Sequence, residues 1–92
     1  MTMTMSMTTT DARPIIYTQP GCAPCRAVVA RFDRYVVPYE LVDISEDLEA
    51  YELLAQAGIS STPAFDLGQG LTTRVGDALA YVKAYINEEG AA

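Results

Sequence analysis

The chain contains no histidine and no tryptophan, and only two of its 92 residues are cysteines. Without histidine it lacks the commonest metal ligand and the most versatile general base near neutral pH. Two cysteines are too few for a disulfide scaffold, and a closed structural zinc site needs four ligands. We therefore expect no metal site within one chain, and a zinc site remains an alternative only if two copies share it.

Long apolar segments are also missing. No apolar run approaches the roughly 20 residues that a membrane span needs, and the N-terminus has neither the basic nor the apolar region of a secretory signal. With so few cysteines, a reducing compartment fits best, because a disulfide there is transient and catalytic. We therefore expect a cytoplasmic protein.

Basic residues are scarce, with 6 lysines and arginines against 12 acidic residues and a formal net charge of −6. Such a surface disfavours nucleic acid and anionic membranes, and it favours solubility or a basic partner.

Half of the chain is apolar, which is enough for one small domain with a real core. We expect a monomer.

The first ten residues read MTMTMSMTTT, a low-complexity segment. We interpret residues 1–12 as a disordered leader, residues 13–89 as the folded domain and residues 90–92 as a frayed tail. A remote alternative is a Cu(I) site built from the thioethers of Met1, Met3, Met5 and Met7.

Apolar periodicity and turn residues predict four strands and three helices. The expected strands are residues 15–18, 39–44, 64–67 and 71–75. The expected helices begin at residue 23, after the N-cap Ser45, and at Gly76-Asp77; they end near Val36, at Gly58, and near Asn87, where we expect fraying. The expected apolar stripes are Val28, Val29, Phe32 and Val36; Leu48, Tyr51, Leu54 and Ala55; and Leu79, Val82 and Ile86.

The order of these elements is β-α-β-α-β-β-α, which indicates an α/β fold. A helix joins the first two strands, so they should be parallel, while the Gly68-Gln69-Gly70 turn makes the last two an antiparallel hairpin. We therefore predict a four-stranded mixed sheet with helices on both faces.

Both cysteines lie in the motif Cys22-Ala23-Pro24-Cys25, between the first strand and the first helix. If Cys22 is the N-cap, its sulfur should accept a hydrogen bond from the Cys25 amide, because Pro24 has no N–H to donate. The helix dipole and Arg26 would further stabilise a thiolate at Cys22. This spacing indicates a redox motif in which Cys22 attacks a disulfide and Cys25 resolves the intermediate. Two buried structural cysteines are the alternative.

Pro63 precedes the third strand. An X-Pro bond is far more often trans than cis, so from these residues alone we expect a trans proline at the start of an edge strand. A cis bond is the alternative.

The segments 17–25, 42–45, Thr62-Pro63 and Gly76-Asp77 together resemble the glutaredoxins, over roughly residues 14–88. They are also similar to the glutaredoxin-like redoxins that serve ribonucleotide reductase. The resemblance implies a thioredoxin-like fold and a cis-proline loop at Thr62-Pro63, where the Thr62 backbone pairs with a peptide or with glutathione. It also implies that Gly76-Asp77 holds the γ-glutamyl end of glutathione.

Two positions depart from that pattern. Gln19 stands where glutaredoxins usually carry lysine, and Pro24 stands where they usually carry tyrosine or phenylalanine. The change at Gln19 leaves the reductant open. The residues to which the resemblance assigns substrate or glutathione binding are Gln19, Pro24, Arg26, Thr62, Pro63, Gly76 and Asp77.

Sequence and resemblance together predict a small dithiol–disulfide oxidoreductase that reduces protein disulfides and donates electrons to ribonucleotide reductase. We expect no bound cofactor, and glutathione is one of two candidate reductants. One alternative is recycling by thioredoxin reductase. Two others are an iron–sulfur module in which glutathione assists Cys22, and a redox-inactive adaptor.

Overall fold

A computed structural model describes residues 13–91. The predicted leader, the methionine–copper alternative and Ala92 lie outside the described residues. The elements follow the predicted order: β1 (Ile15–Thr18), α2 (Ala23–Arg34), β2 (Glu40–Asp43), α3 (Leu48–Gln56), β3 (Ala64–Asp66), β4 (Leu71–Thr72) and α4 (Val75–Ala91).

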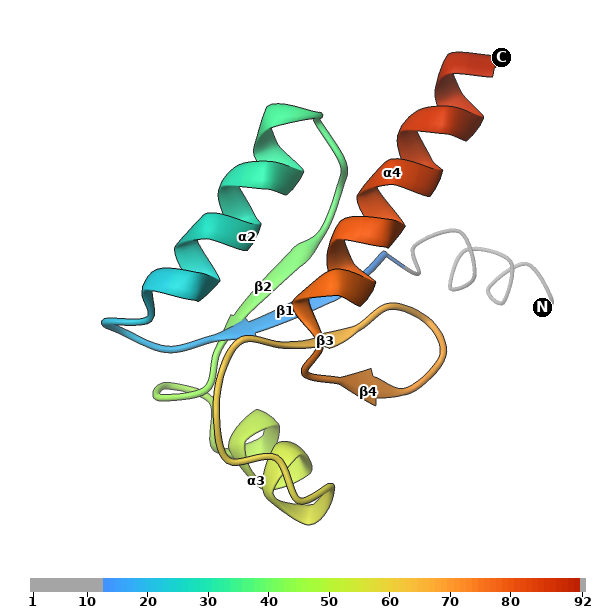
Figure 1. Ribbon diagram of the computed structural model, residues 1–92. Coiled ribbons are helices and arrows are strands. Elements are labelled where there is room, and N and C mark those ends of the chain that lie inside the picture. The colour runs from blue at the N-terminus through green and yellow to red at the C-terminus, as the bar shows by residue number, and fades with distance from the viewer. Residues whose placement is uncertain (1–12, 92) are drawn as a thin grey trace, which may run out of the picture.

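The four strands form one mixed sheet in the order β2-β1-β3-β4. β1 is parallel to β2 and antiparallel to β3, and β3 is antiparallel to β4. In this register Tyr17 lies between Val42 on one side and Ala64 on the other. α2 and α4 cover one face of the sheet, and α3 covers part of the other (Figure 1). The predicted thioredoxin-like architecture is confirmed.

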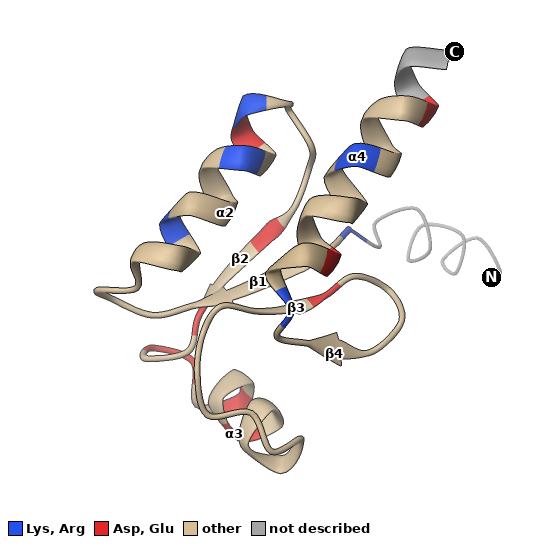
Figure 2. Ribbon diagram, in the orientation of Figure 1, with Lys and Arg blue, Asp and Glu red and all other residues tan. Residues whose placement is uncertain are grey.

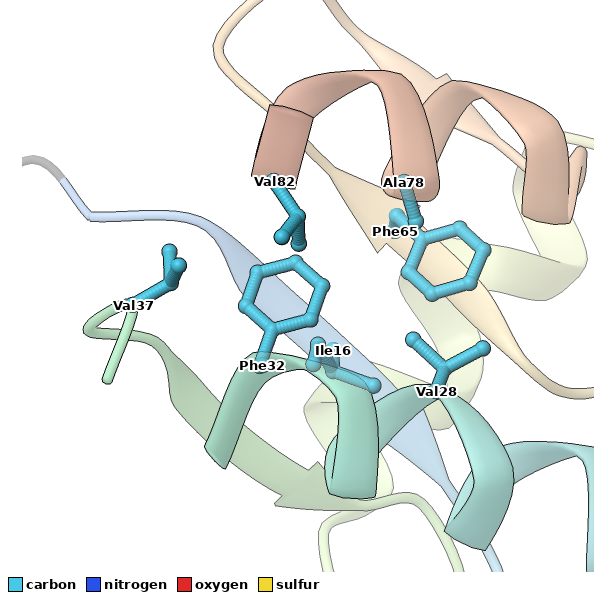
Figure 3. Close-up of a cluster of buried hydrophobic side chains, with 7 residues drawn as sticks. All are labelled: Ile16, Val28, Phe32, Val37, Phe65, Ala78 and Val82. Atoms are coloured by element: carbon cyan, nitrogen blue, oxygen red, sulfur yellow. The ribbon is translucent and has the colours of Figure 1, made fainter. Parts of the chain in front are cut away.

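The main core lies between the sheet and the layer formed by α2 and α4 (Figure 3). Phe32 is at its centre with no exposed surface. The ring of Tyr39 meets Phe32 edge-on at 5.6 Å, and Tyr81 stacks on it at 6.2 Å. The buried members of this cluster are Ile16, Val28, Phe32, Val37, Phe65, Ala78 and Val82.

A smaller cluster joins α3 to the opposite face, where Ala50 and Leu54 pack near Tyr17 and Ala64. The predicted stripe on α3 is partly wrong, because Leu48 and Tyr51 are 70 % and 54 % exposed. Only the side of α3 that carries Ala50 and Leu54, four positions apart, is buried against the sheet.

The end of α2 differs from the prediction. The helix stops at Arg34, and Val36 takes a left-handed conformation with φ of 55°. The Val36 N–H donates to the Asp33 carbonyl at 3.1 Å, and the Val37 N–H donates to the Phe32 carbonyl at 2.9 Å. These two bonds match a Schellman ending, which turns the chain so that Val37, rather than Val36, enters the core.

Replacing Val36 by glycine is expected to stabilise the protein by about 1 kcal/mol, because a left-handed conformation strains a residue that carries a Cβ. Val36 is 82 % exposed, so little buried surface is lost. Urea unfolding measures the gain. Val36→Ala is the matched control and should gain less, since alanine keeps the Cβ. A glycine variant less stable than the alanine variant would contradict the prediction.

The cap of α3 is Asp47 and not Ser45. The Asp47 carboxylate accepts from the Ala50 N–H at 3.1 Å, whereas the Ser45 hydroxyl donates to Asp43 at 2.7 Å. Ser45 therefore belongs to the turn after β2. Both side chains are good cap formers, and their local sequence does not distinguish them.

The last helix begins earlier and runs further than expected. β4 contains only Leu71 and Thr72, and α4 starts at Val75 rather than Gly76. Ala78 is fully buried on its inner side, while the predicted Leu79 is only partly buried. α4 extends to Ala91, past Asn87, where the sequence led us to expect fraying.

Candidate active site

Cys22 caps the N-terminus of α2, as predicted. The chain leaves β1 at Thr18 and turns at Gly21, whose φ of 76° suits a residue without a Cβ. The Cys22 sulfur then accepts a hydrogen bond from the Cys25 N–H at 3.2 Å. Pro24 is the second residue of the helix and has no N–H to offer, so the cap bond comes from the third.

The two cysteines form a disulfide, and their Cα atoms lie 5.2 Å apart across the first helical turn. Cys25 is 1 % exposed and Cys22 is 9 % exposed. Cys22 is therefore the more exposed residue of the pair. This difference is consistent with Cys22 as the attacking cysteine and Cys25 as the resolving one.

The first turn of α2 favours negative charge at Cys22. It contains no acidic residue, and its amides place the positive end of the helix dipole at the cap. The Arg26 N–H donates to the Cys22 carbonyl at 3.2 Å, while the Arg26 side chain is exposed. A thiolate at Cys22 therefore has a local source of stabilisation even without a contact from the Arg26 guanidinium.

The Thr62–Pro63 peptide bond is cis, so the expectation of a trans bond is wrong and the alternative is confirmed. Pro63 is buried and immediately precedes β3. Because Ala64 pairs with Tyr17 in an antiparallel register, the start of β3 lies at the edge of the sheet where β1 ends. This pairing brings the loop of Pro63 to the same edge as the loop of Cys22.

Gln19 is exposed and lines a pocket of about 320 Å³ at this edge. Ser60 and Ser61 line it too, and sequence reasoning did not include them in the site. Their position directly before Thr62-Pro63 is the signal that could have identified them. The remaining residues that line this pocket are Ile44, Tyr51, Leu54, Ala55, Gly58 and Ile59.

The hydroxyl of Thr62 is buried and has no hydrogen-bond partner among residues 13–91.

Gly76 and Asp77 lie in the first turn of α4. Asp77 is held in place, because its carboxylate accepts from the Thr72 hydroxyl at 2.9 Å and its N–H donates to the Arg74 carbonyl at 3.0 Å. β4 is antiparallel to β3, so the start of α4 also lies toward the edge of the sheet where β3 begins. The Cys22 and Pro63 loops thus lie at one edge, whereas Asp77 lines a separate pocket of about 400 Å³ with residues of the β3–β4 turn, among them Gln69 and Gly70.

Among residues 13–91, no helix is long and apolar enough to cross a membrane. The same part of the chain holds no group of three or more acidic, cysteine or histidine side chains arranged to bind a metal ion.

Comparison with known proteins identifies the family. The glutaredoxin family model matches residues 15–68, a segment that contains the Cys22–Cys25 motif and the cis proline. The Gene 56 protein of Mycobacterium phage D29 is 46 % identical over 35 residues, which cover 38 % of this chain and 39 % of that protein.

Two solved structures show the same fold. The glutaredoxin-like protein NrdH-redoxin from Escherichia coli superposes with a TM-score of 0.67 at 23 % identity, covering 74 % of this chain and 92 % of that one. A glutaredoxin from Brucella melitensis gives a TM-score of 0.59 at 24 % identity, covering 84 % and 85 % of the two chains. With the family match and the cysteine pair at the start of α2, this chain belongs to the glutaredoxin family and is a thiol–disulfide oxidoreductase.

Proposed function

We propose that this redoxin uses both cysteines to reduce disulfides in protein clients, and that ribonucleotide reductase is one of them. The observation that carries the proposal is the cap bond from the Cys25 amide to the Cys22 sulfur, at a helix N-terminus beside the cis-proline loop. The choice of ribonucleotide reductase rests on the sequence similarity to redoxins that serve this enzyme.

The reaction takes two exchange steps. In the reduced protein the Cys22 thiolate attacks a client disulfide, which forms a bond between Cys22 and the client and releases one client thiolate. The Cys25 thiolate then attacks the Cys22 sulfur, which forms the Cys22–Cys25 disulfide and releases the second client thiolate. Two electrons pass to the client, and a separate reductant must return them to the redoxin.

We also propose that the client lies along the Thr62 backbone in an extended conformation. β3 pairs with β1 only from Ala64 to Asp66, and Thr62 lies before this paired segment. Its main-chain groups therefore lie outside the sheet ladder and are suited to pairing with an added peptide strand. This arrangement would bring a client disulfide to Cys22.

For the reductant we favour thioredoxin reductase over glutathione. Glutathione is an anion, and Gln19 is neutral where glutaredoxins usually offer lysine. The end of β2 adds negative charge nearby, because Asp43 pairs with Thr18. The Escherichia coli NrdH-redoxin, described as glutaredoxin-like with a thioredoxin-like activity profile, provides a precedent for this combination.

NADPH oxidation with a disulfide client will distinguish the two reductants. We expect faster turnover with thioredoxin reductase than with glutathione and glutathione reductase. Gln19→Lys should raise the glutathione-driven rate by up to about fivefold, since an exposed ion pair contributes at most ~1 kcal/mol. Gln69→Lys, an exposed position in the β3–β4 turn, is the control of equal charge. Faster turnover with glutathione would reverse the choice of reductant, and turnover with neither would refute the proposed function.

A further inference from the structure

Among the helices, lysine and arginine occur only on α2 and α4. No lysine or arginine occurs between Arg34 and Arg74, a stretch that includes β2, α3 and β3. α2 and α4 together carry four basic and four acidic residues, whereas the charged residues of α3 and of the turn before it are all acidic (Figure 2). The acidic residues therefore dominate the face of the sheet that α3 covers.

On this face, β1, β2 and α3 enclose a groove of about 450 Å³. Tyr17 and Val42 are neighbours across β1 and β2 and contribute from the sheet. One side of α3 forms a wall, because Glu49, Leu53 and Gln56 lie three or four positions apart. The other lining residues are Asp47, Ala50 and Glu52, so the groove has three carboxylates and no cation.

Tyr17 contributes the phenol that lines this groove from the sheet. Its side chain is 4 % exposed, yet none of the side-chain hydrogen bonds among residues 13–91 involves its hydroxyl. Burial raises the pKa of Tyr17 above its usual value, and the negative charges of Asp66, Glu40 and Asp47 raise it further. The Tyr17 hydroxyl has no side-chain partner among residues 13–91, but it is not enclosed, because in this part of the chain only the Thr62 hydroxyl is both buried and unpartnered. It is neutral and lies in a negative field, which suits a cationic hydrogen-bond donor.

One large apolar side chain of the groove is exposed. Leu53 lines the groove and is 46 % exposed, and Glu49 and Glu52 line it too. Covering Leu53 with an apolar side chain of a partner would stabilise a complex. The matching partner carries lysine or arginine next to apolar residues.

We propose that this groove is a docking site for a basic, partly apolar segment of the protein client. A lysine or arginine side chain enters between Glu49 and Glu52 toward the Tyr17 hydroxyl, and a neighbouring apolar side chain covers Leu53. The proposal rests on the proposed function, and it adds a class of client. Tyr17 lies one residue before the end of β1, so a client bound here is close in the fold to the edge that carries Cys22.

Two synthetic peptide disulfides test this docking site. Both have the same residues around the disulfide. One adds a segment of alternating lysine and leucine, and in the other glutamate replaces each lysine. We expect kcat/KM to be about three- to tenfold higher for the lysine peptide, as two weak ion pairs would give. The preference should shrink as salt is raised, because the Debye length falls to about 3 Å at 1 M.

The double variant Glu49→Gln/Glu52→Gln should remove most of this preference, mainly by raising KM for the lysine peptide. Tyr17→Phe, which removes only the hydroxyl, should lower it more modestly. Glu88→Lys on α4 is the control, because it changes the net charge by the same two units away from the groove and Glu88 is exposed. A lysine peptide with serine in place of cysteine should still bind, with NMR shifts at Val42, Ala50 and Leu53.

Three results would overturn the docking site: equal kcat/KM for both peptides, equal losses in the double variant and in Glu88→Lys, or concentration-dependent self-association that the double variant abolishes. The last would assign the groove to basic side chains of a second copy. Turnover of bis(2-hydroxyethyl) disulfide separates the two proposals. A protein that reduces this small disulfide, and reduces both peptides with equal kcat/KM, would refute only the docking site. A protein that reduces none of the three would refute the proposed function.

Discussion

Replacing Cys22 by serine is expected to abolish disulfide-reductase activity completely. Serine can accept the same cap hydrogen bond from the Cys25 amide, so the helix start should survive. It cannot supply the thiolate that attacks a disulfide, because its hydroxyl stays protonated at neutral pH. Reduction of a protein disulfide, with circular dichroism as a check on folding, measures this result.

Replacing Cys25 by serine should instead trap the intermediate. Cys22 can still attack, but no second thiolate releases the client, so a mixed disulfide between Cys22 and the client accumulates. Mass spectrometry under non-reducing conditions should find the mass of the redoxin plus that of the client. Ala23→Ser is the matched control, because Ala23 is exposed between the two cysteines and its change should leave turnover intact. Trapping by Cys22→Ser rather than by Cys25→Ser would reverse the two assigned roles.

The largest loss of stability is expected at Phe32. Replacing it by alanine should cost about 3–5 kcal/mol, because the change combines lost burial with a cavity. Phe32 has no exposed surface and contacts the rings of both Tyr39 and Tyr81, so the truncation affects α2, α4 and the segment before β2 together. A small domain has a total stability of only about 5–15 kcal/mol, so a large part of it depends on this side chain.

Urea unfolding of Phe32→Ala measures that cost. Tyr35→Ala is the control, because this aromatic residue lies three positions further along, is 44 % exposed and has the Arg34 guanidinium 5.7 Å from its ring centre. It should lose about 1 kcal/mol or less, as exposed substitutions do. A loss below about 1 kcal/mol at Phe32 as well would mean that Tyr39 and Tyr81 close over the cavity.

The start of α2 could be predicted in detail because its causes are local. Cys22, Pro24 and Cys25 lie within four residues, and the missing N–H of Pro24 decides which amide caps the helix. The element order could also be predicted, since each apolar stripe and each glycine turn is a feature of its own segment. The main core residues Val28, Phe32 and Val82 follow from the same periodicity.

The sequence did not predict the structure correctly where two local conformations have similar free energies. Ser45 and Asp47 are both good caps, and the structure uses Asp47. Val36 and Val37 are both apolar, and the hydrogen bonds that end α2 bury only Val37. On α3 the periodicity allows several stripes, and contact with the sheet selects Ala50 and Leu54. In each case a tertiary contact outweighs a small local preference.

The sequence by itself thus determined the redox pair, the cap of its helix and the order of the elements. Only the tertiary structure decided the cis state before Pro63 and the meeting of its loop with that of Cys22. The meeting of the two loops depends on the pairing of Tyr17 with Ala64, which are 47 positions apart in the chain. The acidic groove beside Tyr17 has the same origin, because residues distant in sequence share a face only once the strands are in register.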